Sequence, residues 1–187
     1  MLLNDLIKIL ETNIQKDIYK DWKTGERRIK MILKSIVDED FINYKKPSMF
    51  IVTAQCDFKC DRECGKKICQ NSPLAKERNI IMDDIDIVRR YMNNPITEAI
   101  VFGGLEPLDT VPELLNLMKE FRQVTGDDIV IYTGYKEVEI EYTLEELKRF
   151  DNVIVKFGRY IPNDRPIADK LLGVTLASSN QYAKRIS

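Results

Sequence analysis

The sequence contains no histidine among its 187 residues. That absence removes the commonest acid/base group of enzymes and the commonest nitrogen ligand that accompanies cysteine in zinc sites. Neither sign of charge is in excess, since 29 Lys and Arg residues stand against 30 Asp and Glu residues. We therefore expect no partner among nucleic acids and no acidic, disordered chain.

Long apolar runs are absent as well. No stretch approaches the roughly 18 apolar residues of a membrane-spanning helix, and the first residues lack the basic region and cleavage site of a secretory signal. No internal repeat or low-complexity tract interrupts the chain. We expect a soluble, cytoplasmic protein without membrane contact, long enough to bury one main core.

The first 46 residues are predicted to be helical. Apolar residues recur at helical spacing over residues 2–19, and again from Ile29 to Val37. Beyond Pro47 the pattern changes to a short apolar run, typical of a buried strand. We place a boundary near residue 46, so that residues 1–46 form an N-terminal helical extension and residues 47–187 form the main domain.

Strands and helices alternate in the main domain. We predict helices that begin near Asp83, Thr110 and Thr143, and strands at residues 49–52, 99–102, 129–132 and 153–155. This alternation indicates parallel βαβ units, too few for a closed eight-fold barrel, so we predict an α/β fold with a partial, open (βα) barrel. Ligands of such sheets collect at the carboxyl ends of the strands.

Four cysteines lie in one loop, at Cys56, Cys60, Cys64 and Cys69. Thiolates are soft ligands, and a compact set suits an iron–sulfur cluster or zinc. Structural zinc sites usually draw on two Cys-x-x-Cys pairs, and no pair here has that spacing. The residues therefore favour a cluster over zinc and over reduced surface thiols.

This loop resembles that of radical S-adenosylmethionine (SAM) enzymes, most closely the activating component of anaerobic ribonucleotide reductase. That family has Cys-x3-Cys-x2-Cys followed by x-Asn. Cys56 and Cys60 match the first two ligands, and Cys69 with Asn71 matches the third, although eight residues separate Cys60 from Cys69. Cys64 is the alternative third ligand. The resemblance covers about residues 47–187, whereas residues 1–46 match nothing we can name.

Other segments resemble the family in the same order. In the family, the glycines and the acid of one motif meet the amino group of SAM, and the next loop faces the adenosine end. The matching segments are Gly103-Gly104-Leu105-Glu106-Pro107, in which Leu105 is inserted, then Thr133-Gly134-Tyr135, and finally Ala177-Ser178-Ser179-Asn180-Gln181. Each alone would be an ordinary turn or polar tail, but their shared order strengthens the resemblance.

Three further features have two interpretations each. Phe58 would shield the cluster from water or would pack beside the first strand. Lys156 and Arg159 would bind the SAM carboxylate or would face solvent. Basic residues around the cysteine loop would attract an acidic electron donor or would form a solvated surface: Lys59, Arg62, Lys66, Lys67, Lys76 and Arg78.

The resemblance implies two cofactors, a 4Fe-4S cluster and SAM. Three thiolates leave one iron for the amino and carboxylate groups of SAM, and an electron from the cluster cleaves SAM to methionine and a 5′-deoxyadenosyl radical. The implied function is installation of a glycyl radical on the large subunit of an anaerobic ribonucleotide reductase, with flavodoxin or ferredoxin as electron donor. The alternatives are a radical SAM enzyme for another peptide or small molecule, and a non-catalytic Fe-S or zinc adaptor.

Overall fold

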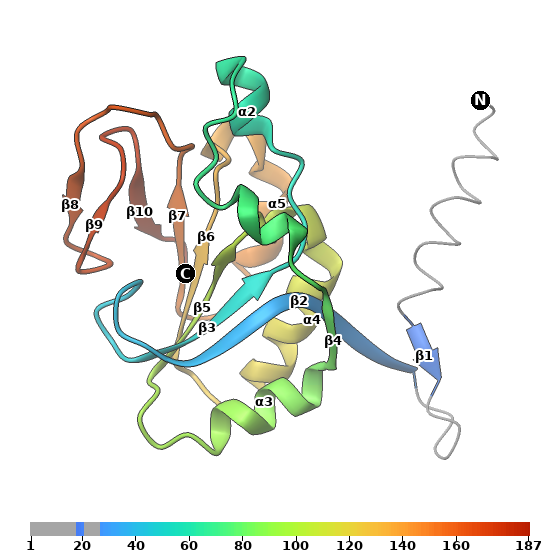
Figure 1. Cartoon of the computed structure of the whole chain (residues 1–187). Coiled ribbons are helices and arrows are strands. Elements are labelled where there is room, and N and C mark those ends of the chain that lie inside the picture. Colours follow the sequence, from blue (N-terminus) through green and yellow to red (C-terminus); the bar gives the residue numbers. More distant parts are fainter. Residues whose placement is uncertain (1–17, 21–26) are drawn as a thin grey trace.

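A computed structural model describes residues 18–20 and 27–187 of the chain (Figure 1). The predicted first helix, over residues 2–19, falls almost wholly outside the described residues, and strand β1 (Ile18–Lys20) takes up its last two. No helix in the described part of the chain is long and apolar enough to cross a membrane.

The centre of the fold is a parallel sheet, as predicted. Its four central strands lie in the order β3 (Ser48–Thr53), β5 (Ala99–Gly104), β6 (Asp128–Tyr132) and β7 (Val153–Phe157). The connections contain helices α3 (Asp84–Met92), α4 (Val111–Arg122) and α5 (Glu141–Leu147). The predicted strands and helices of the main domain are therefore confirmed, and the fold is mixed α/β; closure into a partial barrel stays a prediction.

Antiparallel strands extend the sheet on both sides. Next to β3 lies the long strand β2 (Arg27–Asp40), which also pairs with β1 and with β4 (Ile80–Asp83). Next to β7 lies β10 (Tyr182–Arg185). A separate hairpin consists of β8 (Ile167–Asp169) and β9 (Val174–Leu176).

The helix predicted over residues 29–37 is wrong, because this segment is the middle of β2. Its apolar spacing fits a helix. In the strand, however, Met31 and Leu33 are two residues apart, lie on the same face and are fully buried. Pairing with β3 decides the outcome, and the β-branched residues of the segment suit a strand. Residues 27–40 therefore belong to the same sheet as the main domain and are not a helical extension.

The threonines at two predicted helix starts do not cap their helices. Helix α4 begins directly after Thr110, but the Thr110 hydroxyl donates to the Pro107 carbonyl at 3.3 Å instead of capping the helix. Helix α5 begins at Glu141, so Thr143 lies within it. The two helices thus lie close to their predicted positions, although neither threonine forms a side-chain cap.

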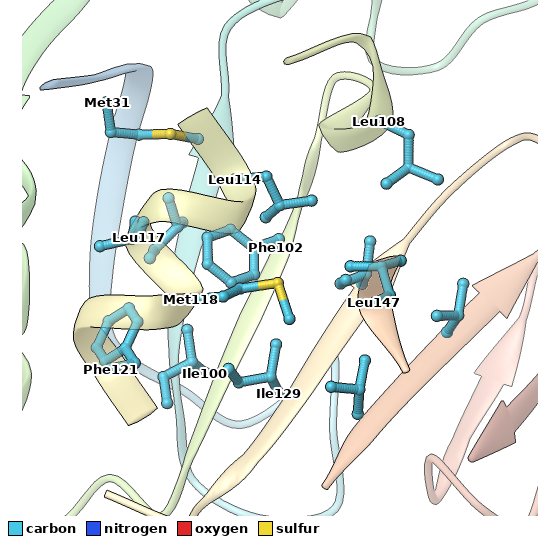
Figure 2. Packing of buried hydrophobic residues seen from close by; sticks show 14 of the residues in the cluster. Met31, Ile100, Phe102, Leu108, Leu114, Leu117, Met118, Phe121, Ile129 and Leu147 are labelled. Atoms are coloured by element: carbon cyan, nitrogen blue, oxygen red, sulfur yellow. The ribbon is translucent and has the colours of Figure 1, made fainter. Parts of the chain in front are cut away.

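The core is built by strand residues that alternate between the two faces of the sheet. Ile100 and Phe102 of β5 lie on the helix face, where Leu114, Leu117 and Phe121 of α4 pack on it (Figure 2). Every labelled side chain in that view is at least nine-tenths buried. The opposite face is covered by the chain around β8 and β9, whose Leu172 and Leu176 pack against a smaller cluster: Tyr44, Ala99, Val101, Val130 and Ile154. The helix face therefore carries the larger hydrophobic core. The face covered by β8 and β9 borders the candidate functional site.

Candidate functional site

A pocket of about 460 Å³ opens beyond the carboxyl ends of the parallel strands. Cys56, Cys60 and Cys69 line it from the loop that follows β3. Glu106 lines it from the loop after β5, and Gly134 from the loop after β6. Its volume lies in the range of ordinary small-molecule sites. The topology therefore brings the predicted loops together at one edge of the sheet, as expected.

The three pocket cysteines differ from the fourth. Cys56, Cys60 and Cys69 are partly buried, whereas Cys64 is exposed, at the end of the short helix α2 (Lys59–Cys64), and does not line the pocket. Burial raises the pKa of Cys56 to about 12, although the backbone N–H of Phe58, 3.3 Å from its sulfur, opposes the shift. Burial also raises the pKa of Cys60. Three soft sulfur donors on one pocket are the ligand set that an iron–sulfur cluster needs, so this donor set fits a cluster.

Asp109 anchors the beginning of the cysteine loop. One carboxylate oxygen of Asp109 accepts the backbone N–H of Asp57 at 2.7 Å, and the other accepts the hydroxyl of Tyr135 at 2.7 Å. Phe58 follows with φ 53°, a left-handed conformation that is uncommon outside glycine, and starts helix α2. Its ring does not line the pocket, and neither does Tyr135.

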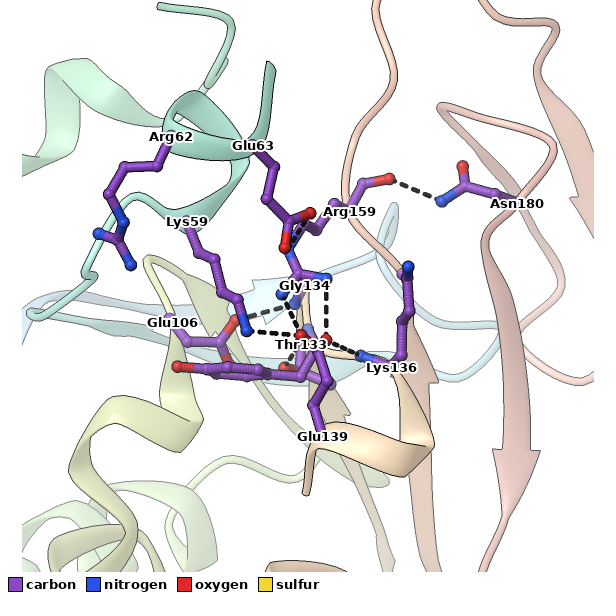
Figure 3. A network of polar contacts seen from close by, with 12 residues as sticks. Lys59, Arg62, Glu63, Glu106, Thr133, Gly134, Lys136, Glu139, Arg159 and Asn180 are labelled. Atoms are coloured by element: carbon purple, nitrogen blue, oxygen red, sulfur yellow. Dashed lines mark hydrogen bonds and ion pairs between the residues drawn. The ribbon is translucent and has the colours of Figure 1, made fainter. Parts of the chain in front are cut away.

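An ionic network fixes helix α2 from the other side (Figure 3). Arg159, which follows β7, makes two 2.8 Å hydrogen bonds to Glu139 and lies 3.3 Å from Glu63. Lys59 pairs with the same Glu139 at 2.5 Å. The Arg159 and Lys59 partners hold the pKa of Glu139 well below its usual range. Arg159 is therefore a buried clamp on the loop, and the interpretation that it faces solvent is wrong.

Glu106 joins the loops that follow β5 and β6. Its carboxylate accepts the backbone N–H of Gly134 at 2.8 Å and that of Leu108 at 3.1 Å, and it also interacts with the side chain of Thr133. Burial raises the pKa of Glu106 to about 7, against the effect of these donors. Although Leu105 is inserted, Glu106 still lines the pocket.

Lys156 brings a buried cation to the same pocket. Its ammonium group donates to the Gly158 carbonyl at 2.9 Å, and no carboxylate of the described residues lies within ion-pair distance. Burial lowers the pKa of Lys156 to about 8, opposed by the charges of Glu106 and Cys60. The Gly158 carbonyl also accepts from Gln181 at 3.2 Å, which gives the C-terminal motif a role in holding this loop. Lys156 can therefore receive an anionic group.

The two glycines that end β5 are required by the sheet. A side chain at Gly103 would lie 2.9 Å from the Phe50 ring. At Gly104, with φ 86°, it would lie 2.4 Å from a methyl group of Val52. Gly104 still lines the pocket, and its carbonyl accepts from the Asn71 amide at 2.6 Å.

The structure thus gathers only part of the predicted set in one pocket. Lining it are Cys56, Cys60, Cys69, Gly104, Glu106, Thr133 and Gly134. Outside it are Phe58, Cys64, Gly103, Pro107 and Tyr135. Sequence reasoning missed Asp61 of helix α2, Asp109 just after the Glu106 motif, and Tyr160, which lines the pocket. The ligand roles of all these residues stay predictions.

The basic residues near the cysteine loop fall into two groups. Lys59 and Arg62 are paired with Glu139 and Asp57, respectively. The others are exposed and form no ion pair within the described chain: Lys66, Lys67, Lys76 and Arg78. Only the second group has the free charge that the predicted donor surface needs.

Comparison with known families agrees with the geometry. The 4Fe-4S single cluster domain matches residues 47–182, more than half of the chain. The chain therefore belongs to this family, and the predicted 4Fe-4S cluster is confirmed at that level.

One curated protein is similar over most of the chain. It is the probable dual-specificity RNA methyltransferase RlmN of Clostridium beijerinckii, 21% identical over 169 residues, or 87% of this chain. The match spans 41% of the length of that relative. No solved structure shows a significant match. Together, the family and this relative support a radical SAM enzyme with a 4Fe-4S cluster and SAM as cofactors.

Proposed function

We propose that the protein is a radical SAM enzyme of the glycyl-radical-activase type, with its cluster on Cys56, Cys60 and Cys69. The observation that carries the proposal is the convergence of three thiols, the Glu106 carboxylate and the Lys156 ammonium on one pocket. A structural iron–sulfur or zinc adaptor needs no such pocket beside its metal. The pocket therefore favours an enzyme over an adaptor.

The charges of the pocket suit the amino-acid end of SAM. Glu106 accepts a hydrogen bond from the amino group, and Lys156 pairs with the carboxylate. Gly134, which has no side chain, leaves space beside the thiol of Cys60. When bound, the reduced cluster supplies the electron that cleaves SAM to methionine and a 5′-deoxyadenosyl radical.

Apolar side chains also line the pocket. Phe50 and Val52 contribute from β3, and Val174 and Leu176 from β9. Such a lining excludes water from the reacting groups and limits side reactions of a radical. This part of the chain therefore protects the radical until the acceptor is reached.

The proposed acceptor is the large subunit of an anaerobic ribonucleotide reductase, supported by the ordered motifs from Cys56 to Gln181. The test mixes reduced, reconstituted protein with SAM and that subunit, and follows the glycyl radical by electron paramagnetic resonance. We expect a radical only when all three are present. SAM cleavage without a radical on the subunit would contradict this acceptor and point to another peptide, a small molecule or RNA, the substrate named for the relative.

The proposed electron donor is an acidic protein such as flavodoxin or ferredoxin. Its support is the exposed cations in and after the cysteine loop that form no ion pair within the described chain, Lys66 and Lys67 among them. Reversing both charges, with Lys66→Glu and Lys67→Glu, should slow SAM cleavage driven by flavodoxin but leave cleavage driven by dithionite unchanged. Equal rates with flavodoxin would contradict this docking surface.

A further inference from the structure

The side chain of Asp61 bridges the two ends of the segment between Cys60 and Cys69. The same carboxylate oxygen of Asp61 accepts the backbone N–H of Ile68 at 2.8 Å and the backbone N–H of Cys69 at 2.9 Å. Hydrogen bonds to a carboxylate are about twice as strong as neutral ones. Asp61, which directly follows Cys60, is thus hydrogen-bonded to the backbone of Cys69.

Asp61 is itself well placed for this role. It lies in the first turn of α2, where its own N–H donates to the Phe58 carbonyl at 3.0 Å. The neighbouring Arg62 pairs with Asp57 and so does not compete for the Asp61 carboxylate. Gly65, with φ 68°, ends the helix and lets the chain turn back toward Cys69.

The chain after Cys69 is held by other contacts. The Asn71 amide donates to the Gly104 carbonyl at 2.6 Å. The buried ammonium of Lys34, on β2, donates to the Ala75 and Glu77 carbonyls at 3.3 and 2.7 Å. Among the described residues, the contacts to Asp61 are the only side-chain hydrogen bonds of residues 65–70.

We propose that Asp61 is a positioning residue that selects Cys69, and not Cys64, as the third cluster ligand; the inference rests on the proposed cluster. Helix α2 keeps Cys64 exposed and outside the pocket, whereas the two hydrogen bonds of Asp61 hold Cys69 at the pocket. Cys69 can therefore act as the third ligand although eight residues separate it from Cys60.

The test measures iron release to a chelator from anaerobically reconstituted full-length protein. Asp61→Ala should release iron at least about ten-fold faster than the wild type, because it removes two charge-assisted hydrogen bonds. Asp86→Ala is the control, since Asp86 is an exposed residue of α3 that pairs only with Arg89 among the described residues. It should match the wild type. Equal release rates for Asp61→Ala and the wild type would overturn the inference.

A double variant shows whether Asp61 acts independently of Cys64. Adding Asp61→Ala to Cys64→Ser should accelerate iron release by the same factor as in the wild type, because Cys64 is not a ligand. No acceleration in the Cys64→Ser background would overturn the inference. If Asp61→Ala does not yield folded protein by circular dichroism, Asp61→Asn decides: its neutral oxygen should give an intermediate rate, and a wild-type rate would overturn the inference.

Failure of the inference is distinguishable from failure of the proposed function. Wild-type protein that takes up no iron would contradict the proposed function itself. Wild-type protein that holds a cluster, with an Asp61→Ala variant that holds it equally well, would contradict only the role of Asp61.

Discussion

The carboxylate of Glu106 accepts a hydrogen bond from the backbone N–H of Gly134 at 2.8 Å. This contact joins the loops that follow two adjacent parallel strands, β5 and β6, directly beside the cysteine loop. It keeps Glu106 in the pocket although the motif contains an additional leucine. The Glu106 carboxylate, to which we assign a role in SAM binding, thus also holds the two loops of the site together.

Charge removal at Glu106 should weaken SAM binding. Glu106→Gln keeps the size of the side chain but replaces the anion that is proposed to accept from the amino group. Affinity for SAM should fall by about ten-fold or more, since a charge-assisted hydrogen bond is worth about 1.5 to 3 kcal/mol. Iron content should stay unchanged. Equilibrium binding of SAM measures the effect, with Glu141→Gln on α5 as control; unchanged affinity would show that Glu106 only holds the two loops together.

A methyl group at Gly134 should block the ligand without disturbing the fold. The new Cβ would lie 3.5 Å from a Glu106 oxygen and 3.6 Å from the Cys60 sulfur, which are ordinary contacts. The melting temperature of Gly134→Ala should therefore match that of the wild type, while SAM affinity falls by roughly ten-fold or more. Gly126→Ala, with no atom within 4 Å of its Cβ, is the control. Wild-type affinity in Gly134→Ala would place the ligand elsewhere.

The fold could be predicted where burial leaves a clear pattern. Strands β3, β5, β6 and β7 are short apolar runs because both of their faces are buried. Strand β2 was mistaken for a helix because its apolar residues fit both periods, and only its pairing with β3 decides between them. Strand β10 has an ordinary polar sequence, and only its pairing with β7 makes it a strand.

The site could be predicted where one segment carries the chemistry. The cysteines stand close together in the chain, so their spacing alone indicated a cluster. The Glu139 and Arg159 clamp joins residues 20 apart, and the contact of Asp109 with Tyr135 joins residues 26 apart. Such pairs depend on how the loops meet in space, and no local pattern reveals them.

The cysteine register should follow the burial of the thiols. Cys64→Ser should retain iron, the electron paramagnetic resonance signal of the reduced cluster and SAM cleavage, because Cys64 is exposed and outside the pocket. Cys69→Ser should lose all three. The reverse pattern would make Cys64 the third ligand. Loss in both variants would indicate a site with four thiolates, with no iron open to SAM.

A buried carboxyl at Asp84 should make stability depend on pH. It is 5% exposed, and one of its oxygens has no hydrogen-bond partner among the described residues. Burial raises the pKa of Asp84 from 3.8 to about 7, aided by the charges of Glu120, Asp83 and Glu113 and opposed by the Met31 N–H. The folded state thus binds a proton more tightly than the unfolded state. This contribution is fully present below pH 4 and is lost as the pH rises through about 7.

Asp84→Asn tests this dependence. The unfolding free energy of the variant relative to the wild type should rise between pH 5 and pH 8 by roughly 1 to 3 kcal/mol, since a pKa difference of one is worth about 1.4 kcal/mol. Urea unfolding at the two pH values measures the difference. Asp86→Asn, on the same helix but exposed, is the control. A difference between variant and wild type that is the same at both pH values would show that the Asp84 charge is accommodated in the fold.

The most direct test of the central claim is SAM cleavage by the isolated protein. After anaerobic reconstitution the protein should contain about four iron and four sulfide per chain. On reduction with dithionite it should convert SAM to 5′-deoxyadenosine and methionine in equal amounts, and Cys56→Ser should not. Stoichiometric zinc with no iron uptake, or a reduced 4Fe-4S cluster that forms no 5′-deoxyadenosine from SAM, would contradict the assignment as a radical SAM enzyme.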